Sequence, residues 1–180
     1  MVKHQSQYVI AYKGLREGLH LFDFKVDDSF FEKYENSEIE KGNVEVHVTL
    51  NKKTTILEFL FELNGEVYLP CDRCLKPFSL EIDYEAPLYF KFGVETHEET
   101  DELFIISEQE TEIDLSQFIY EFIHLSLPYR RVHPDDENGQ PTCDKEMLKR
   151  LEELSAGSEK SEDSETDPRW NDLKNLFNNN

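Results

Sequence analysis

The stretch LPCDRCLKP, residues 69–77, lies between two runs in which apolar and polar residues alternate. Two cysteines separated by two residues, with a proline on each side, predict a tight turn that presents both sulfur atoms to one side. Such a pair is either half of a tetrahedral metal site or a reactive dithiol. The stretch therefore predicts a turn between two strands and a candidate site at the same place.

The alternating runs on both sides of this turn predict a β-sheet. Residues 44–50 and 57–63 place Val, Leu and Phe on one face, and residues 78–84 continue the pattern after the turn. Asn64-Gly65 is typical of a hairpin turn, and Pro87 is expected to interrupt the last run. Because parallel pairing needs a crossover of a dozen or more residues, we expect an antiparallel meander.

The region after the sheet predicts one long helix. Asp114 is the expected N-cap, apolar residues recur at helical spacing from Leu115 to Leu125, and Pro128 ends the run. The acidic stretch 95–112, with eight acidic residues and no Lys or Arg, is expected to hold one more strand at 103–106. The predicted fold class is α+β: an antiparallel β-meander sheet, partly closed, that is covered by one long helix and followed by C-terminal helices and an acidic linker.

Three segments are expected along the chain. A single α+β domain covers residues 1–150, and a helix over 145–154 is expected at its end. Residues 151–167 form an acidic flexible linker, because they bury too little apolar surface to order themselves. Residues 168–177 form a C-terminal docking helix with Trp170 on its apolar face. A helix this short is marginal alone, so its face must dock on the protein's own sheet or on a partner.

Composition favours an acidic protein of a reducing compartment. The chain has 19 Lys and Arg against 39 Asp and Glu, a formal charge of −20 and a pI of about 4.6. Such a surface repels phosphate backbones and attracts basic partners. Three cysteines, an odd number, and the absence of a charged-then-apolar leader predict a reduced, cytoplasmic protein. No apolar run approaches the length of a bilayer span, so no membrane partner is expected.

Few residues in the sequence could complete a four-ligand metal site with the cysteine pair. Cys143 is the only other cysteine, and His133 lies in the same polar, proline-bounded segment. A site of Cys71, Cys74, His133 and Cys143 would take one structural zinc and fasten the late loop to the turn, although the spacing of His133 and Cys143 is longer than in usual ligand pairs. The alternatives are a turn with reduced thiols and a redox dithiol. Redox dithiols sit at a helix N-terminus, whereas this turn has strands on both sides.

Enzymatic motifs are absent from the sequence. There is no phosphate-binding glycine loop, no GxSxG and no HExxH, and the chain has only seven glycines. The carboxylates fall on the solvent faces of the predicted strands and in acidic stretches, which is typical of a solvated surface. We therefore expect no enzymatic activity and no small-molecule substrate, and interpret the chain as an acidic binding module.

The chain resembles the YceD family, the large ribosomal RNA subunit accumulation proteins. The resemblance rests on the turn at 71–75 after a β-hairpin, on the acidic stretch and helix from Asp114, and on DPRWNDLKNL at 167–176. It spans about residues 44–177. It implies a bacterial cytoplasmic factor that is needed for normal accumulation of large-subunit ribosomal RNA and has no catalytic activity. The resemblance also implies a gene of the kind that commonly neighbours one for a small zinc-ribbon ribosomal protein of that subunit.

This chain departs from the family pattern in the late loop. Many relatives carry a second cysteine pair there, whereas this chain has only Cys143, with His133 upstream. The resulting hypothesis is a ribosome biogenesis factor that binds a basic ribosomal protein or the pre-ribosomal large subunit. Direct binding of ribosomal RNA and a thiol- or zinc-dependent regulatory role are the alternatives. The candidate binding residues are Arg73, Arg130, Arg131, Arg169 and Trp170, although Arg73 could instead brace the turn through a nearby carboxylate.

Overall fold

The computed structural model describes residues 7–35 and 37–155. Its elements are β1 (Val9–Ile10), η1 (Tyr12–Gly14), β2 (Gly18–Val26), α1 (Asp28–Phe31), β3 (Lys41–Lys52), β4 (Ile56–Pro70), β5 (Pro77–Gly93), β6 (His97–Thr100), β7 (Leu103–Ser107), β8 (Ile113–Asp114), α2 (Ser116–Leu125) and α3 (Lys145–Leu154). The described residues divide into two compact units between Cys143 and Asp144. Among the described residues, the first unit holds every strand with α1 and α2, and the second holds α3.

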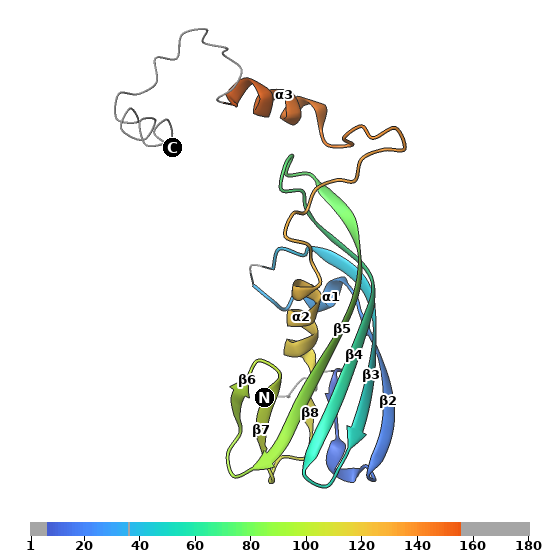
Figure 1. Cartoon of the computed structure of the whole chain (residues 1–180), viewed down its shortest axis with the longest axis vertical. Helices are drawn as coiled ribbons and strands as arrows, with labels where there is room; N and C mark the ends of the chain where they lie inside the picture. The colour runs from blue at the N-terminus through green and yellow to red at the C-terminus, as the bar shows by residue number, and fades with distance from the viewer. Residues whose placement is uncertain (1–6, 36, 156–180) are drawn as a thin grey trace, which may run out of the picture. The chain divides into compact units, whose positions relative to one another are not determined.

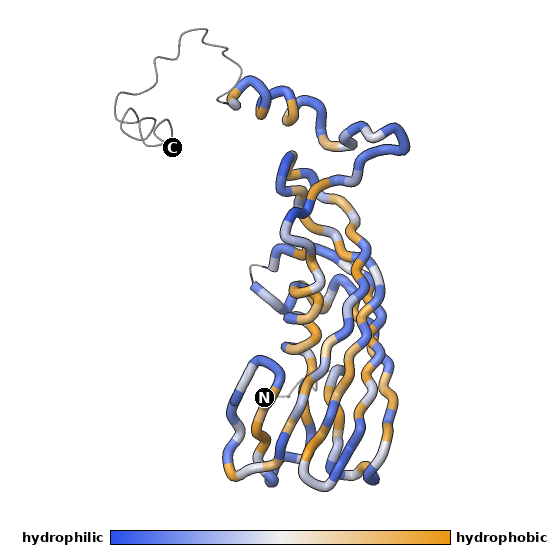
Figure 2. Tube along the Cα trace, in the orientation of Figure 1, coloured by the Kyte–Doolittle hydropathy of each residue, from blue (hydrophilic) through white to orange (hydrophobic). Residues whose placement is uncertain are grey.

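The main sheet has six strands in the order β2-β3-β4-β5-β7-β6. Neighbours from β2 to β5 are antiparallel, as predicted, and alternate in hydropathy along their length (Figure 2). The predictions of a wholly antiparallel and partly closed sheet are wrong. β5 and β7 pair in parallel, and β2 and β6 are the two open edges. The connection between β5 and β7, residues 94–102, is short. It contains β6, which runs antiparallel to β7 at the edge of the sheet and returns the chain to the start of β7.

The predicted hairpin turn at Asn64-Gly65 is also wrong, because β4 runs straight through it. Gly65 pairs with Val44 on β3 and with Ile82 on β5. A Cβ atom on Gly65 would lie 2.2 Å from the backbone oxygen of Asn43. Glycine is therefore required at this point because two strands approach each other closely. The Asn-Gly pair alone does not distinguish such a close approach from a hairpin turn.

Pro87 does not interrupt β5 either. It pairs with Leu60 inside the 17-residue strand. The backbone N–H of Tyr89 points toward the β7 side of β5, where it donates to the oxygen of Glu102. Pro87, two residues earlier, has its nitrogen on the same side, but β7 pairs with β5 only from Tyr89 onward. A missing donor at Pro87 therefore breaks no ladder hydrogen bond.

Helices α1 and α2 lie on the same side of the sheet (Figure 1). The predicted N-cap, Asp114, is one residue too early, because the N-cap position of α2 is Leu115, which makes no side-chain cap hydrogen bond. Asp114 lies two residues before the helix and accepts hydrogen bonds from the backbone nitrogen and the hydroxyl of Ser116. α2 packs on the sheet through aromatic rings: Phe122 contacts Phe61 and Phe118 contacts Phe90, at 5.0 and 5.7 Å between centroids. At ten residues, α2 is shorter than the one long helix that was predicted.

The ends of the chain are described in part. β1 pairs with β8 as a separate two-stranded sheet. The predicted helix at 145–154 is confirmed as α3, with Asp144 as its cap. The predicted docking helix at 168–177 and most of the predicted linker lie outside the described residues. No helix of the described residues is long and apolar enough to cross a membrane.

Candidate metal centre

The β4–β5 hairpin ends in the cysteine turn that the sequence predicts. Cys71 accepts a backbone hydrogen bond from Leu75 and donates one to Lys76, which closes the turn. The backbone N–H of Arg73 points at the Cys71 sulfur, with 3.4 Å between the two atoms. Leu75 takes a left-handed backbone conformation with φ of 61°, and its side chain is exposed. The turn therefore aims both sulfur atoms inward at the cost of some backbone strain.

The late loop brings His133 and Cys143 together although nine residues separate them in sequence. The loop folds back on itself: Asp135 and Pro141 form a β-bridge, and the Thr142 hydroxyl donates to the backbone oxygen of Pro134 at 2.6 Å. This closure reduces a long spacing to adjacent positions at the base of the loop. The long sequence spacing of His133 and Cys143 therefore does not keep the two residues from lying at the same site.

The four predicted ligands converge on one point. The ligand atoms of Cys71, Cys74, His133 and Cys143 all lie within 4.8 Å of one another. The Cys71 and Cys143 sulfurs are 3.8 Å apart, the Cys74 sulfur lies 3.5 Å from His133 Nδ1, and the Cys143 sulfur lies 3.8 Å from His133 Nδ1. All three cysteines are buried, and the structure shows them as free thiols.

The Cys71–Cys143 and Cys74–His133 separations match the edges of a zinc tetrahedron, and the Cys143–His133 separation of 3.8 Å is slightly longer than its edge. With Zn–S bonds of about 2.3 Å and Zn–N bonds of about 2.0 Å, neighbouring sulfurs lie about 3.8 Å apart, and sulfur and nitrogen lie about 3.5 Å apart. Three thiols and one imidazole are also the donor types that zinc prefers. The four residues can therefore hold a metal ion in a closed, four-ligand arrangement, which is typical of a structural rather than a catalytic site.

The electrostatics of the thiols differ within the cluster. Burial opposes ionisation of Cys71, but hydrogen bonds from the Cys74 and Arg73 backbone and from His133 outweigh it and lower the pKa of Cys71 to about 6. Burial raises the pKa of Cys143, and the nearby thiols of Cys71 and Cys74 raise it further. Three thiolates this close repel one another, and a divalent cation would offset that repulsion.

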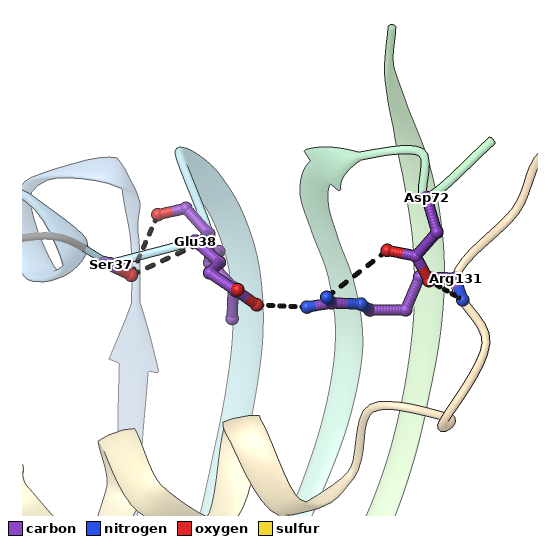
Figure 3. Close-up of polar contacts among 5 residues, drawn as sticks. Ser37, Glu38, Asp72 and Arg131 are labelled. Atoms are coloured by element: carbon purple, nitrogen blue, oxygen red, sulfur yellow. Dashed lines mark hydrogen bonds and ion pairs between the residues drawn. The ribbon is translucent and has the colours of Figure 1, made fainter. Parts of the chain in front are cut away.

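Two supports outside the ligand set fix the late loop on the hairpin. The backbone N–H of Asp72 donates to the oxygen of Arg131, and the backbone N–H of Arg131 donates to the Asp72 carboxylate, both at 2.7 Å. The Arg131 guanidinium then bridges Asp72 and Glu38 (Figure 3). The ring of Phe78 lies 4.9 Å from that of His133 and holds the imidazole in place. Sequence reasoning missed these supports, although Asp72 lies inside the cysteine turn.

The predicted binding residues are distributed differently. Arg130 is exposed, Arg73 is half-buried in the turn, and Arg131 is engaged with the two carboxylates. Arg169 and Trp170 lie outside the described residues. The structure therefore brings together the four candidate ligands but gathers no cluster of the candidate arginines at one exposed face of the described chain.

A model of the family named for the large ribosomal RNA subunit accumulation protein YceD matches residues 59–177. The chain belongs to the YceD family. The match begins in β4 and includes the cysteine turn, α2 and the late loop, so every candidate ligand lies inside it. Comparisons with curated proteins and with solved structures found no match. The description of the YceD family links it to large-subunit ribosomal RNA and names no enzymatic activity.

Proposed function

We propose that this protein is a non-enzymatic, cytoplasmic ribosome biogenesis factor that supports accumulation of large-subunit ribosomal RNA by binding a basic ribosomal protein, alone or on the pre-ribosomal large subunit. Family membership supports the ribosomal role. The formal charge of −20 supports a basic protein as the direct partner, because a surface of this sign attracts Lys- and Arg-rich segments.

The observation that carries the proposal is the outer face of the sheet, on the side away from α2. Pairing and alternation place carboxylates there in rows: Glu62 lies directly opposite Glu85, and Glu66 directly opposite Glu81. We define the acidic face as Glu45, Glu62, Glu66, Glu81, Asp83 and Glu85. Like charges directly opposite each other destabilise a sheet. A basic partner offsets this repulsion, so the face is suited to a cationic ligand.

The candidate metal centre supports this role indirectly. One structural zinc on Cys71, Cys74, His133 and Cys143 would fix the late loop to the tip of the hairpin that carries much of the acidic face. The three thiols are 0, 2 and 3% exposed, which favours a structural metal over a reactive or regulatory dithiol. Zinc would supply only a cross-link here, and the binding surface belongs to the sheet.

Direct binding of ribosomal RNA is less well supported by the charges. The side chain of Arg131 is 23% exposed and paired with Glu38 and Asp72, so it offers little to a phosphate. The exposed carboxylates of β4 and β5 would repel an RNA backbone. A protein client therefore fits the described surface better than RNA does.

Affinity capture with the tagged full-length chain at low salt tests the proposal. We expect one or more basic large-subunit proteins to be retained after nuclease treatment. Capture should fall at least fivefold for Glu81→Gln/Glu85→Gln, which removes one charge from each facing pair. Glu32→Gln/Glu35→Gln changes the same number of exposed charges elsewhere and should leave capture unchanged. Loss of every ribosomal protein after nuclease treatment would refute the protein-client function.

A further inference from the structure

A groove of about 590 Å³ lies between α2 and the β6–β7 hairpin, away from the acidic face and from the metal centre. Phe104 of β7 and Phe118 of α2 meet edge to face, with 5.0 Å between their ring centroids, and form its aromatic floor. Both rings also contact the core residue Phe90, at 5.6 and 5.7 Å. The floor is therefore held by the packed sheet rather than by the groove's own edges.

Apolar side chains of α2 face this groove as well as the sheet. Ile119 and Ile123 are fully buried, whereas Leu125 is 64% exposed and lines the groove. Phe118 and Leu125 are seven residues apart, two helical turns, so they lie on one stripe of the helix. An exposed leucine continuous with an aromatic floor is typical of a surface that packs against a partner.

The rim of the groove carries charge of one sign. Glu98 and Asp101 come from the hairpin side and Glu121 from α2, and no Lys or Arg among the described residues lines the groove. Glu98 and Asp101 are exposed, and Glu121 accepts a hydrogen bond from Gln117 at 2.7 Å. An occupant must therefore offer apolar side chains to the floor and positive charges to the rim.

We infer that this groove is the docking site for a basic amphipathic segment of the protein client. A Leu- or Phe-like side chain of that segment packs on Phe104 and Phe118, and flanking Lys or Arg side chains pair with Glu98, Asp101 and Glu121. The inference rests on the proposed function, because it names the part of the basic client that the protein recognises. Electrostatic attraction to the acidic face is long-range. The groove instead recognises an apolar side chain that is flanked by Lys or Arg side chains.

Fluorescence anisotropy with a defined probe tests the inference on the full-length protein. The probe is a labelled peptide of Lys, Leu and Phe with its apolar residues on one helix face, and its control is a scrambled peptide of the same composition. We expect saturable one-to-one binding that is at least tenfold tighter than that of the scrambled peptide. Equal binding of the two peptides, or no binding, would overturn the inference.

Variants locate the bound peptide. Glu98→Lys/Asp101→Lys and Leu125→Asp change exposed groove positions and should each weaken binding at least tenfold, with thermal melting confirming that both fold. Glu32→Lys/Glu35→Lys makes the same charge change at exposed positions that belong to neither the groove nor the acidic face, and should alter peptide binding less than twofold. An equal loss in this control would mean unspecific charge attraction and would overturn the inference. Dimers of the wild-type chain that Leu125→Asp dissociates would assign the groove to a second copy instead.

Failure of this inference is distinguishable from failure of the proposed function. If Leu125→Asp and Glu98→Lys/Asp101→Lys capture the ribosomal client as well as the wild type, the groove is not its docking site, and the protein-client function stands. If the wild type captures no ribosomal protein after nuclease treatment, the proposed function fails, and the inference fails with it whatever the peptide does.

Discussion

Neutralising the facing carboxylates of the acidic face should stabilise the protein. In Glu81→Gln/Glu85→Gln, each substitution removes one member of a pair that lies directly opposite in the β4–β5 register. Cβ atoms of such pairs are about 5 Å apart, and two unit charges about 6 Å apart in water repel by about 0.7 kcal/mol. Salt at about 0.15 M, with a Debye length of about 8 Å, halves this value. The two pairs together predict a gain of about 1.4 kcal/mol at very low salt and about 0.7 kcal/mol at physiological salt.

Urea denaturation and thermal melting at several salt concentrations measure this gain. A change of about 0.7 kcal/mol corresponds to a rise in Tm of about 2 °C for a domain of this size, and the rise should grow as salt is removed. Glu32→Gln/Glu35→Gln reports the general effect of lowering the net charge. A double variant no more stable than this control, or a gain that does not depend on salt, would refute the reasoning. If the double variant is more stable than the wild type but captures the client less well, the carboxylates serve binding at the expense of stability.

Substitutions at three further positions test local features of the hairpin. Gly65→Ala should destabilise the protein by about 3 kcal/mol, measured by urea denaturation, because its Cβ would meet the Asn43 carbonyl; a loss below about 1 kcal/mol would mean that the strands separate easily. Leu75→Val should cost about 1 kcal/mol and Leu75→Gly should be neutral or slightly stabilising, since only backbone strain is at stake at an exposed position; equal effects would contradict the strain. Asp72→Ala should cost about 1–2 kcal/mol through its lost hydrogen bond from Arg131, and hydrogen exchange should show the late loop opening first; an unchanged exchange rate there would show that this contact does not fix the loop.

Strand existence was predictable from sequence, but strand boundaries were not. Alternation in residues 44–50, 57–63 and 78–84 predicts the centres of β3, β4 and β5, because one face of each is buried. The local signals at Gly65 and Pro87 gave wrong breaks, since their roles depend on which neighbouring strand approaches. β6 was missed because all its residues are polar and exposed, and with it the parallel pairing of β5 and β7.

The ligand set was predictable because few residue types bind zinc. With three cysteines in the chain, Cys71, Cys74 and Cys143 are the natural thiol ligands, and His133 lies in the same late segment. Closure of the late loop and the pairing of Asp72 with Arg131 were not predictable, because both depend on backbone hydrogen bonds between distant segments. The groove beside α2 was missed for a similar reason: helical spacing does not tell which of two apolar stripes the sheet leaves uncovered.

Metal content is the most direct test of the central claim that Cys71, Cys74, His133 and Cys143 form a centre that fastens the late loop to the hairpin. Native mass spectrometry of the full-length chain, purified without chelator, should show one zinc per chain. Cys143→Ser should lose it, whereas Ser126→Ala, a matched change away from the cluster, should keep it. A wild-type chain that folds with all thiols reduced and binds no zinc when the metal is supplied would contradict the account.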